Sequence, residues 1–159
     1  MAANLFDLTG ATALVTGGAG VYGASISEAL AQAGAHVIIA SRDLDACDRV
    51  ATTLRGTGSM ASAEQYDQAR EESILALRDR LQNRFESIDV LVNNSVARPM
   101  RHYEDPLKAW QDSMDVNATG LFAISRAAYW HGIRSLFAFL TVAAFRENRD
   151  RGYTTTASD

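Results

Sequence analysis

The chain has 159 residues, enough for one domain with a buried core, and its formal charge of −4 with no basic run argues against nucleic acid as a partner. Its single cysteine, Cys47, excludes an internal disulfide and indicates a reducing compartment, and its three histidines are too far apart in the sequence to indicate a metal site. The longest apolar stretch, residues 136–145, is about half the length that crosses a bilayer, so we expect a soluble, cytoplasmic protein with no membrane partner.

Short β-like runs alternate with amphipathic helical windows over the first 93 residues. This alternation predicts an α/β fold, a Rossmann-like, doubly wound parallel sheet with helices on both faces. Right-handed crossovers together with a glycine-rich loop after the first strand predict the strand order 3-2-1-4. The four strands are predicted over residues 11–16, 36–40, 62–66 and 88–93.

Apolar residues at helical spacing predict a helix after each of the first three strands, and we interpret these stripes as core. Gly34 is expected to end the first helix, and Cys47 is interpreted as a small buried contact in the second. The stripes are Val21, Ile26 and Leu30, then Leu44, Cys47, Val50 and Leu54, then Ile74, Leu77, Leu81 and Phe85.

A long fourth helix is predicted over residues 106–131, with Asp105 as its cap and Pro106 as its first residue. A fifth strand over residues 136–142 would extend the sheet, which we expect to be incomplete at its C-terminal side. The predicted organisation is therefore a dinucleotide-binding domain over residues 1–133 and an atypical tail over residues 134–159.

The first strand runs directly into a glycine-rich loop that opens a helix. Glycines there allow a sharp turn and bring backbone N–H groups close to a pyrophosphate, and the helix N-terminus adds favourable partial charge. The sequence thus predicts a dinucleotide site in this loop. The predicted contacts are Gly17, Gly18, Gly20, Val21, Tyr22 and Gly23.

The residues after the second strand bear on the choice between NADP and NAD. Ser41 and Arg42 lie nearest the strand, and arginine suits a 2′-phosphate. Asp43 leaves NAD open, because an acidic residue binds a ribose 2′-hydroxyl unless it caps the next helix. NADP is therefore favoured over NAD.

Four motifs in the expected order resemble the short-chain dehydrogenase/reductase family, over about residues 8–130. The segment Thr16–Gly23 resembles the family's Thr-Gly-x-x-x-Gly-x-Gly motif, with Val21 where its middle glycine is expected. We expect Gly20, one place earlier, to supply the flexibility. The segment 93–96 resembles Asn-Asn-Ala-Gly, with Ser95 and Val96 in place of the small residues.

The resemblance also implies roles for three further residues. Asp67, after the third strand, would lie against the adenine ring, and Asn93 would lie near the adenosine ribose and steady the central sheet. Asn117, in the segment Asp115-Val-Asn117-Ala-Thr-Gly120, would support a proton-relay water.

The family's reaction is hydride transfer between a nicotinamide cofactor and a small-molecule carbonyl or alcohol, with a tyrosine as general acid/base and a lysine four residues later. None of the five tyrosines has a lysine four residues on, and Lys108 is the only lysine. In the most generous alignment Thr155 and Asp159 take these two positions, where a carboxylate opposes ionisation of the hydroxyl. We expect no turnover by this chain alone.

The family pattern is lost abruptly after Tyr129, which favours a truncated or frame-shifted copy of a longer reductase over a diverged short form retained for binding. The alternative to an oxidoreductase is thus a non-catalytic NAD(P)-binding module or an inactive gene product. The apolar face of the 106–131 helix, with Trp110, Leu121 and Trp130, predicts a homo-oligomer.

Overall fold

The computed structural model describes residues 7–129 and 135–138. Five parallel strands form one sheet in the order β3-β2-β1-β4-β5, which confirms the predicted class and the order 3-2-1-4. Strand β5 lies in the predicted tail and pairs with β4, while residues 139–142 of the predicted fifth strand lie outside the described residues. The strands are β1 (Thr12–Thr16), β2 (His36–Ser41), β3 (Ala61–Gln65), β4 (Val90–Asn93) and β5 (Ser135–Ala138).

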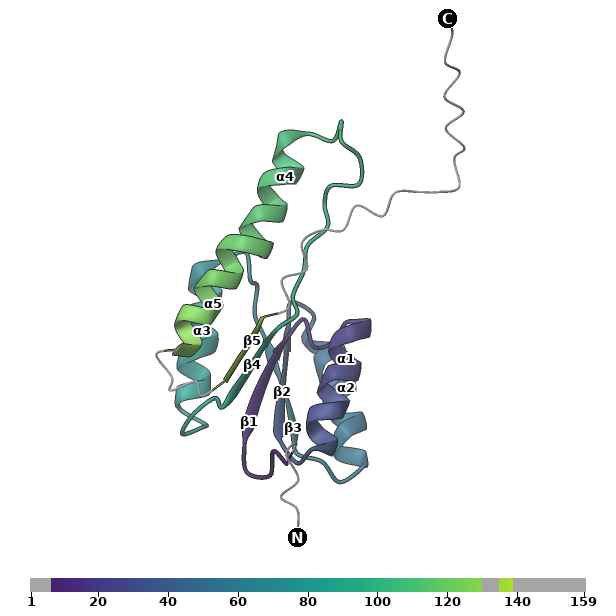
Figure 1. Cartoon of the computed structure of the whole chain (residues 1–159), viewed down its shortest axis with the longest axis vertical. Coiled ribbons are helices and arrows are strands. Elements are labelled where there is room, and N and C mark those ends of the chain that lie inside the picture. The colour runs from purple at the N-terminus through teal and green to yellow at the C-terminus, as the bar shows by residue number, and fades with distance from the viewer. Residues whose placement is uncertain (1–6, 130–134, 139–159) are drawn as a thin grey trace, which may run out of the picture.

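Helices cover both faces of the sheet, with α1 and α2 on one side and α3 and α5 on the other (Figure 1). This is the arrangement that right-handed crossovers between parallel strands produce. The helical elements are α1 (Val21–Gln32), α2 (Leu44–Gly56), α3 (Glu71–Gln82), α4 (Leu107–Met114), the π-helical turn η1 (Asp115–Gly120) and α5 (Leu121–Tyr129).

Alternate strand residues divide the core into two layers. Val15 and Ile39 pack on the side of α1 and α2, whereas Leu14 and Ile38 pack on the side of α3 and α5. Burial on both faces explains why the central strands are continuously apolar rather than alternating. Cys47 is fully buried in the first layer, so its interpretation as a core contact is confirmed.

The end of α1 follows the prediction. Gly34 has a φ of +98°, and the backbone N–H of Ala35 donates to the Leu30 carbonyl (3.1 Å), a bond typical of a helix that ends on a glycine. Among the described residues, no helix is long and apolar enough to span a bilayer, and no group of three or more His, Cys, Asp or Glu side chains is placed to hold a metal ion.

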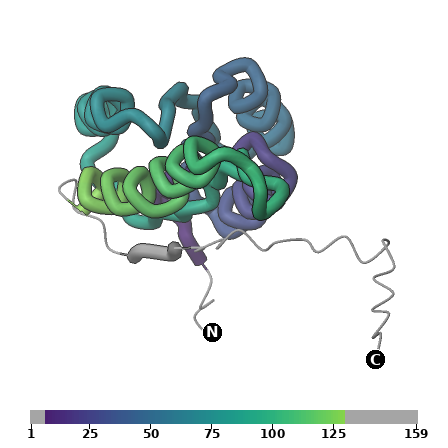
Figure 2. Tube along the Cα trace, turned by 90° about the horizontal axis from the view of Figure 1, so that it is seen from above, coloured from purple at the N-terminus to yellow at the C-terminus, as the bar shows by residue number. Residues whose placement is uncertain are grey.

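The predicted fourth helix differs from expectation in two ways. Asp105 does not cap it: its carboxylate accepts from the backbone N–H groups of Arg101 (2.6 Å) and His102 (2.9 Å), and Pro106 is the N-cap residue. The helix is also interrupted by η1, although Figure 2 shows the run from α4 through α5 as one continuous rod. Its predicted end at residue 131 lies outside the described residues.

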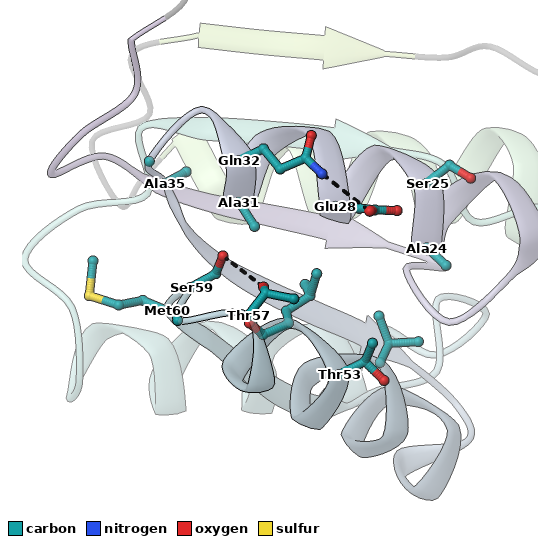
Figure 3. A pocket seen from close by; sticks show the side chains of 14 residues that line it. Ala24, Ser25, Glu28, Ala31, Gln32, Ala35, Thr53, Thr57, Ser59 and Met60 are labelled. Carbon is teal, nitrogen blue, oxygen red and sulfur yellow. Dashed lines mark hydrogen bonds between the residues drawn. The ribbon is translucent and has the colours of Figure 1, made fainter.

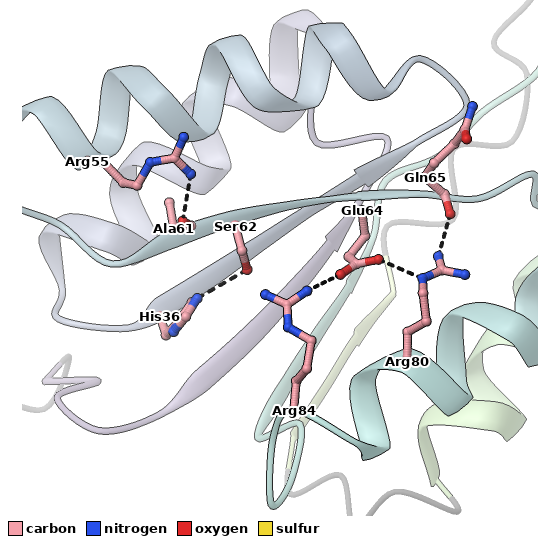
Figure 4. Close-up of polar contacts among 8 residues, drawn as sticks. All are labelled: His36, Arg55, Ala61, Ser62, Glu64, Gln65, Arg80 and Arg84. Carbon is pink, nitrogen blue, oxygen red and sulfur yellow. Dashed lines mark hydrogen bonds and ion pairs between the residues drawn. The ribbon is translucent and has the colours of Figure 1, made fainter.

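Arginines from the neighbouring helices hold the outer edge of the sheet at β3 (Figure 4). Arg55 of α2 donates to the Ala61 carbonyl (3.1 Å), and Arg80 of α3 donates to the Gln65 carbonyl (2.6 Å). The buried Glu64 carboxylate accepts from Arg80 Nε (2.9 Å) and pairs with Arg84. Outward-facing carbonyls at both ends of the strand are therefore occupied, which disfavours pairing with a strand of another chain.

Candidate functional site

The loop between β1 and α1 is shaped by two glycines. Gly17 has a φ of +62°, and a Cβ atom there would lie 2.9 Å from Ser95 Cα. A Cβ atom at Gly23 would lie 2.2 Å from the Gly17 carbonyl oxygen, so only glycine lets α1 start against this loop. Gly20 is the N-cap residue with φ −76°, a conformation open to any residue, so the expected flexibility comes from Gly17 and not from Gly20.

The first turn of α1 is open to an anion. It has no side-chain cap and no acidic residue, and Val21 and Tyr22 are strongly exposed there. Helix α2 differs, because Asp43 Oδ1 accepts from the Ala46 N–H (2.9 Å) and Asp45 lies in the first turn. Free N–H groups and the helix dipole therefore favour a negatively charged group at α1.

Thr16, the last residue of β1, joins the glycine loop to the segment after β4. Its buried hydroxyl donates to the Val92 carbonyl (3.3 Å) and accepts from the N–H groups of Asn94 (3.0 Å) and Ser95 (3.1 Å). Asn94 Nδ2 in turn donates to the Gly17 carbonyl (3.0 Å). The carboxyl ends of β1 and β4 are thus fixed relative to each other.

The loop after β2 is ordered by local hydrogen bonds. The Ser41 hydroxyl donates to the Asp43 carbonyl (3.1 Å), accepts from the Asp43 N–H (3.2 Å) and lies 3.1 Å from Cys47 Sγ. Asp43 is the cap of α2, one of the two roles that the sequence left open for it. Between them Arg42 is exposed, and its guanidinium makes no ion pair with any residue that the structure describes.

One pocket of about 140 Å³ brings four of the predicted residues together: Gly17, Ser41, Arg42 and Asp67. Asp67 Oδ1 accepts from the Ala69 N–H (3.0 Å), which leaves its second carboxylate oxygen without a partner in the described ranges. The same pocket is lined by residues that the sequence did not single out as cofactor contacts. They are Tyr66, Gln68, Ser95, Val96, Ala97 and Val116.

The other predicted residues lie outside this pocket. Gly18 is buried under β2, where a Cβ atom would lie 2.9 Å from Ile39 Cγ2. Asn93 is 2% exposed and points toward α5, with its Nδ2 donating to Ser125 Oγ (2.9 Å). Gly20, Val21, Tyr22 and Gly23 form the start of α1.

Asn117 holds the loop that follows β4. Its Oδ1 accepts from the Ala97 N–H (2.8 Å), and its Nδ2 donates to the Ala97 carbonyl (2.8 Å) and to Ser113 Oγ (3.0 Å). Both of its N–H bonds are therefore used within the protein.

Tyr66 and Gln68 form a polar contact in the wall of the pocket. The Tyr66 hydroxyl donates to Gln68 Oε1 (2.7 Å) and lies 3.1 Å from Ser95 Oγ, while Gln68 Nε2 donates to the Val116 carbonyl (2.9 Å). Burial raises the pKa of Tyr66 well above its usual value, so this tyrosine is a neutral hydrogen-bond donor rather than a general acid/base. The only sequence signal for the pair is its position on either side of Asp67.

A second, larger cavity of about 630 Å³ lies between α1 and α2 (Figure 3). None of the predicted site residues lines it. Its one charged lining residue is Glu28, which is bonded to Gln32 (3.2 Å). A negative wall without basic groups is unsuited to a pyrophosphate, so this cavity is not the candidate site.

Known sequences similar to this chain include dehydrogenases. The sequence model of a family described as short chain dehydrogenase matches residues 11–134. The chain is 35% identical to Glucose 1-dehydrogenase 2 of Bacillus subtilis over 133 residues, 81% of this chain and 51% of that protein. It is 29% identical to Gluconate 5-dehydrogenase of Gluconobacter oxydans, over 82% of this chain and 51% of that protein. The chain spans about half the length of the curated relatives it matches.

Solved structures resemble it over a similar span. The Pseudomonas aeruginosa RhlG/NADP active-site complex is 33% identical with a TM-score of 0.74, covering 79% of this chain and 49% of that one. A short-chain type dehydrogenase/reductase from Mycobacterium marinum is 32% identical with a TM-score of 0.73, covering 80% and 52%.

Proposed function

Because this chain belongs to the short-chain dehydrogenase/reductase family, we propose that it binds a nicotinamide dinucleotide at the carboxyl ends of β1, β2 and β3. A cofactor bound there supplies hydride transfer to or from a small-molecule carbonyl or alcohol. The observation that carries the proposal is the pocket lined jointly by Gly17, Ser41, Arg42 and Asp67.

The residues at this edge of the sheet fit the parts of a dinucleotide. Gly17, Gly18 and Gly23 let the loop pack closely against its own neighbours. The first turn of α1, which starts after the N-cap residue Gly20, then offers its backbone N–H groups to the pyrophosphate. The second carboxylate oxygen of Asp67, which has no partner among residues 7–129, is available to accept from an adenine amine. Asn93 and Asn117 support the site indirectly: Asn93 fixes the end of β4, and Asn117 fixes the loop after it.

We propose NADP rather than NAD as the preferred cofactor. Asp43 is used as the cap of α2, which removes the main argument for a ribose 2′-hydroxyl contact. Arg42, exposed and without an ion pair in the described ranges, lines the pocket and suits a 2′-phosphate.

The experiment is a titration of the wild-type chain and of Arg42→Ala with NADPH and with NADH. We expect the variant to weaken NADPH binding about tenfold and NADH binding far less, because one charge-assisted contact to an exposed phosphate is lost. Arg49→Ala, at an exposed arginine on α2 outside the pocket, is the matched control. Equal weakening of both cofactors would contradict the preference for NADP.

Binding is proposed to occur without turnover by these 159 residues alone. Tyr66 is buried and neutral, and Lys108 pairs with Asp112 on α4. General acid/base catalysis contributes roughly 10² to 10⁴ in rate, and the sequence offers no tyrosine with a lysine four residues later to supply it. NADPH oxidation with any carbonyl above a buffer blank would refute this part.

We also propose that the chain self-associates through the outer face of α4 and α5. The large apolar side chains Leu107, Trp110, Phe122 and Tyr129 are all exposed on this run, from 47% at Trp110 to 73% at Tyr129. Trp130, which the sequence also placed on this face, lies outside the described residues. An apolar stripe of this length is typical of a contact surface between copies of a chain.

A further inference from the structure

We call the pocket lined by Gly17, Ser41, Arg42 and Asp67 the adenosine pocket. Hydrogen bonds that short backbone segments join into a ring lie along one side of it. Ser95 contacts Tyr66, Tyr66 contacts Gln68, and Gln68 contacts the carbonyl of Val116 in η1. The neighbouring residue of η1, Asn117, bonds to both backbone groups of Ala97. Ala97 is two residues from Ser95, so the ring closes through the loop after β4.

The direction of each hydrogen bond follows from one group. The Val116 carbonyl can only accept, so Gln68 must present its Nε2 to it and its Oε1 to Tyr66. Tyr66 must then donate to Gln68, and its oxygen is left to accept from the Ser95 hydroxyl, 3.1 Å away. Every hydrogen bond from Ser95 to Val116 is thereby assigned without choice of rotamer or amide orientation.

Close packing holds Gln68 where the ring needs it. Gln68 is 5% exposed, and a Cβ atom at Gly120, the last residue of η1, would lie 2.2 Å from the Gln68 carbonyl oxygen and 2.7 Å from its Cγ. The glycine therefore lets the π-helical turn contact the chain leaving β3. A side chain at Gly120 would push Gln68 away from the Val116 carbonyl.

We propose that Gln68 is a positioning residue: its amide holds η1 and the loop after β4 at the spacing that keeps the pocket between Asp67 and Ala97 open. The inference rests on the proposed function, because this pocket is the one assigned to the adenosine half of the cofactor. Gln68 also lines the pocket, but its amide oxygen and nitrogen each bond within the protein, to Tyr66 and to the Val116 carbonyl. Its effect passes through Val116 and Asn117 to Ala97 on the opposite rim.

The first test replaces Gln68 by methionine, which has similar length and cannot donate to a carbonyl. We expect Gln68→Met to weaken binding of 2′,5′-ADP, the isolated adenosine half of NADP, about tenfold, since pre-organisation of the rim is lost. Gln82→Met makes the same change at an exposed position of α3 outside the pocket and should bind as the wild type does. Wild-type affinity in Gln68→Met would overturn the inference.

The second test is rescue by protonation in Gln68→Glu. When ionised, the new carboxylate would place an oxygen against the Val116 carbonyl, whereas in its protonated form the carboxyl group can donate to that carbonyl as the amide does. Burial raises the pKa of such a carboxyl, so binding relative to wild type should recover as the pH falls from about 8 to about 5.5. Wild-type protein measured at each pH corrects for protonation of the ligand phosphates and for any pH effect that the nearby carboxylates Asp67 and Asp115 exert in both proteins. If the affinity of Gln68→Glu relative to that of the wild type is the same at both pH values, the hydrogen-bond assignment is refuted.

Hydrogen exchange without any ligand separates this inference from the proposed function. The Ala97 N–H, which bonds to Asn117, should exchange at least about tenfold faster in Gln68→Met, while amides of β2 stay as slow as in the wild type. Should the wild-type chain bind no 2′,5′-ADP, the proposed function fails, and the exchange rate alone decides whether Gln68 holds the two segments. Unchanged exchange at Ala97 would overturn the inference whatever the ligand result.

Discussion

Gly23 lies where the first turn of α1 packs against the loop that precedes it. Replacing it by alanine would place a Cβ atom 2.2 Å from the Gly17 carbonyl oxygen and 2.7 Å from Gly18 Cα. Backbone cannot move aside as a flexible side chain can, so we expect Gly23→Ala to lower the free energy of unfolding by about 3 kcal/mol. Urea denaturation followed by circular dichroism measures the loss.

Gly56 provides the matched control for that substitution. It is the last residue of α2, and a Cβ atom there would meet nothing within 4 Å. Alanine has the higher helix propensity, so Gly56→Ala should be neutral or stabilising by up to about 1 kcal/mol. Equal stability of the two variants would show that the loop can adjust to a methyl group at Gly23.

His36 gives the stability of the molecule a dependence on pH. Its ring packs edge-on against Phe85 (5.0 Å between centroids), and its Nε2 lies 3.1 Å from Ser62 Oγ. Burial, together with the positive charge of Arg84, lowers the pKa of His36 below its usual value. The unfolded chain then binds a proton more readily than the folded one.

Because the pKa of His36 is lower in the folded chain than in the unfolded one, acid destabilises the fold. The stabilising contribution of neutral His36 is complete above its ordinary pKa of about 6.5 and is lost as the pH falls through that value toward the lower folded pKa. We expect the free energy of unfolding to fall between about pH 7.5 and about pH 5.5, and to fall less in His36→Gln. Urea midpoints at the two pH values measure this, and parallel losses in both proteins would exclude His36 as the cause.

The outer edge of the sheet, at β3, is held by the ion pairs of Glu64 with Arg80 of α3 and with Arg84, just after that helix. Glu64 of β3 is 7% exposed at its side chain, whereas the two arginines that it binds are 44% and 47% exposed. Glu64→Gln keeps the shape but turns one acceptor into a donor facing an arginine, so it should cost about 1–2 kcal/mol of unfolding free energy. Glu28→Gln, at an exposed residue of α1 without an ion pair among the described residues, should change stability by less than about 0.5 kcal/mol. A loss no greater at Glu64 than at Glu28 would show that this cluster does not hold the edge.

The elements themselves were predictable to the extent that their signals are local. Short β-like runs predicted the first four strands, helical periodicity predicted the first three helices, and Gly34 marked the end of α1, because each signal depends on residues close in the chain. Asp105 was assigned to the wrong turn because an aspartate caps a loop and a helix by the same hydrogen bond. The π-helical turn went unpredicted because inserting a wide turn changes the spacing of a helix face by only one residue.

The candidate site could be predicted only in part, because some of its contacts join residues far apart in the chain. The residues that line its pocket and follow a strand, Gly17, Arg42 and Asp67, are recognisable because the carboxyl ends of parallel strands meet at one edge. The contact between Gln68 and Val116 joins residues 48 apart in the sequence, and no local pattern specifies it. Asn93 likewise ends its strand but points toward Ser125, because side chains alternate along a strand and the register decides the face.

At the scale of the whole molecule, α3 covers one side of α5, while large apolar side chains remain exposed along the run from α4 through α5. Leu107 is 70% and Phe122 is 64% exposed, and Arg126 covers only part of Phe122, with its guanidinium carbon 5.7 Å from the ring centroid. Burial of such a stripe against a second copy removes apolar area from water, at roughly 25 cal/mol per Å² before the cost of association.

The chain should therefore sediment as a mixture of monomer and larger species whose proportion rises with concentration. A double variant, Leu107→Lys and Phe122→Lys, should move this distribution at least about tenfold in concentration toward the monomer, because each lysine would have to lose its hydration at the contact. Met60→Lys changes a similarly exposed apolar residue, 54% accessible, just before β3 and away from the rod, and should leave the distribution unchanged. Sedimentation velocity at several concentrations distinguishes these outcomes. A wild-type chain that stays monomeric up to millimolar concentration, or a Met60→Lys effect as large as that of the double variant, would show that the α4–α5 face is not the contact.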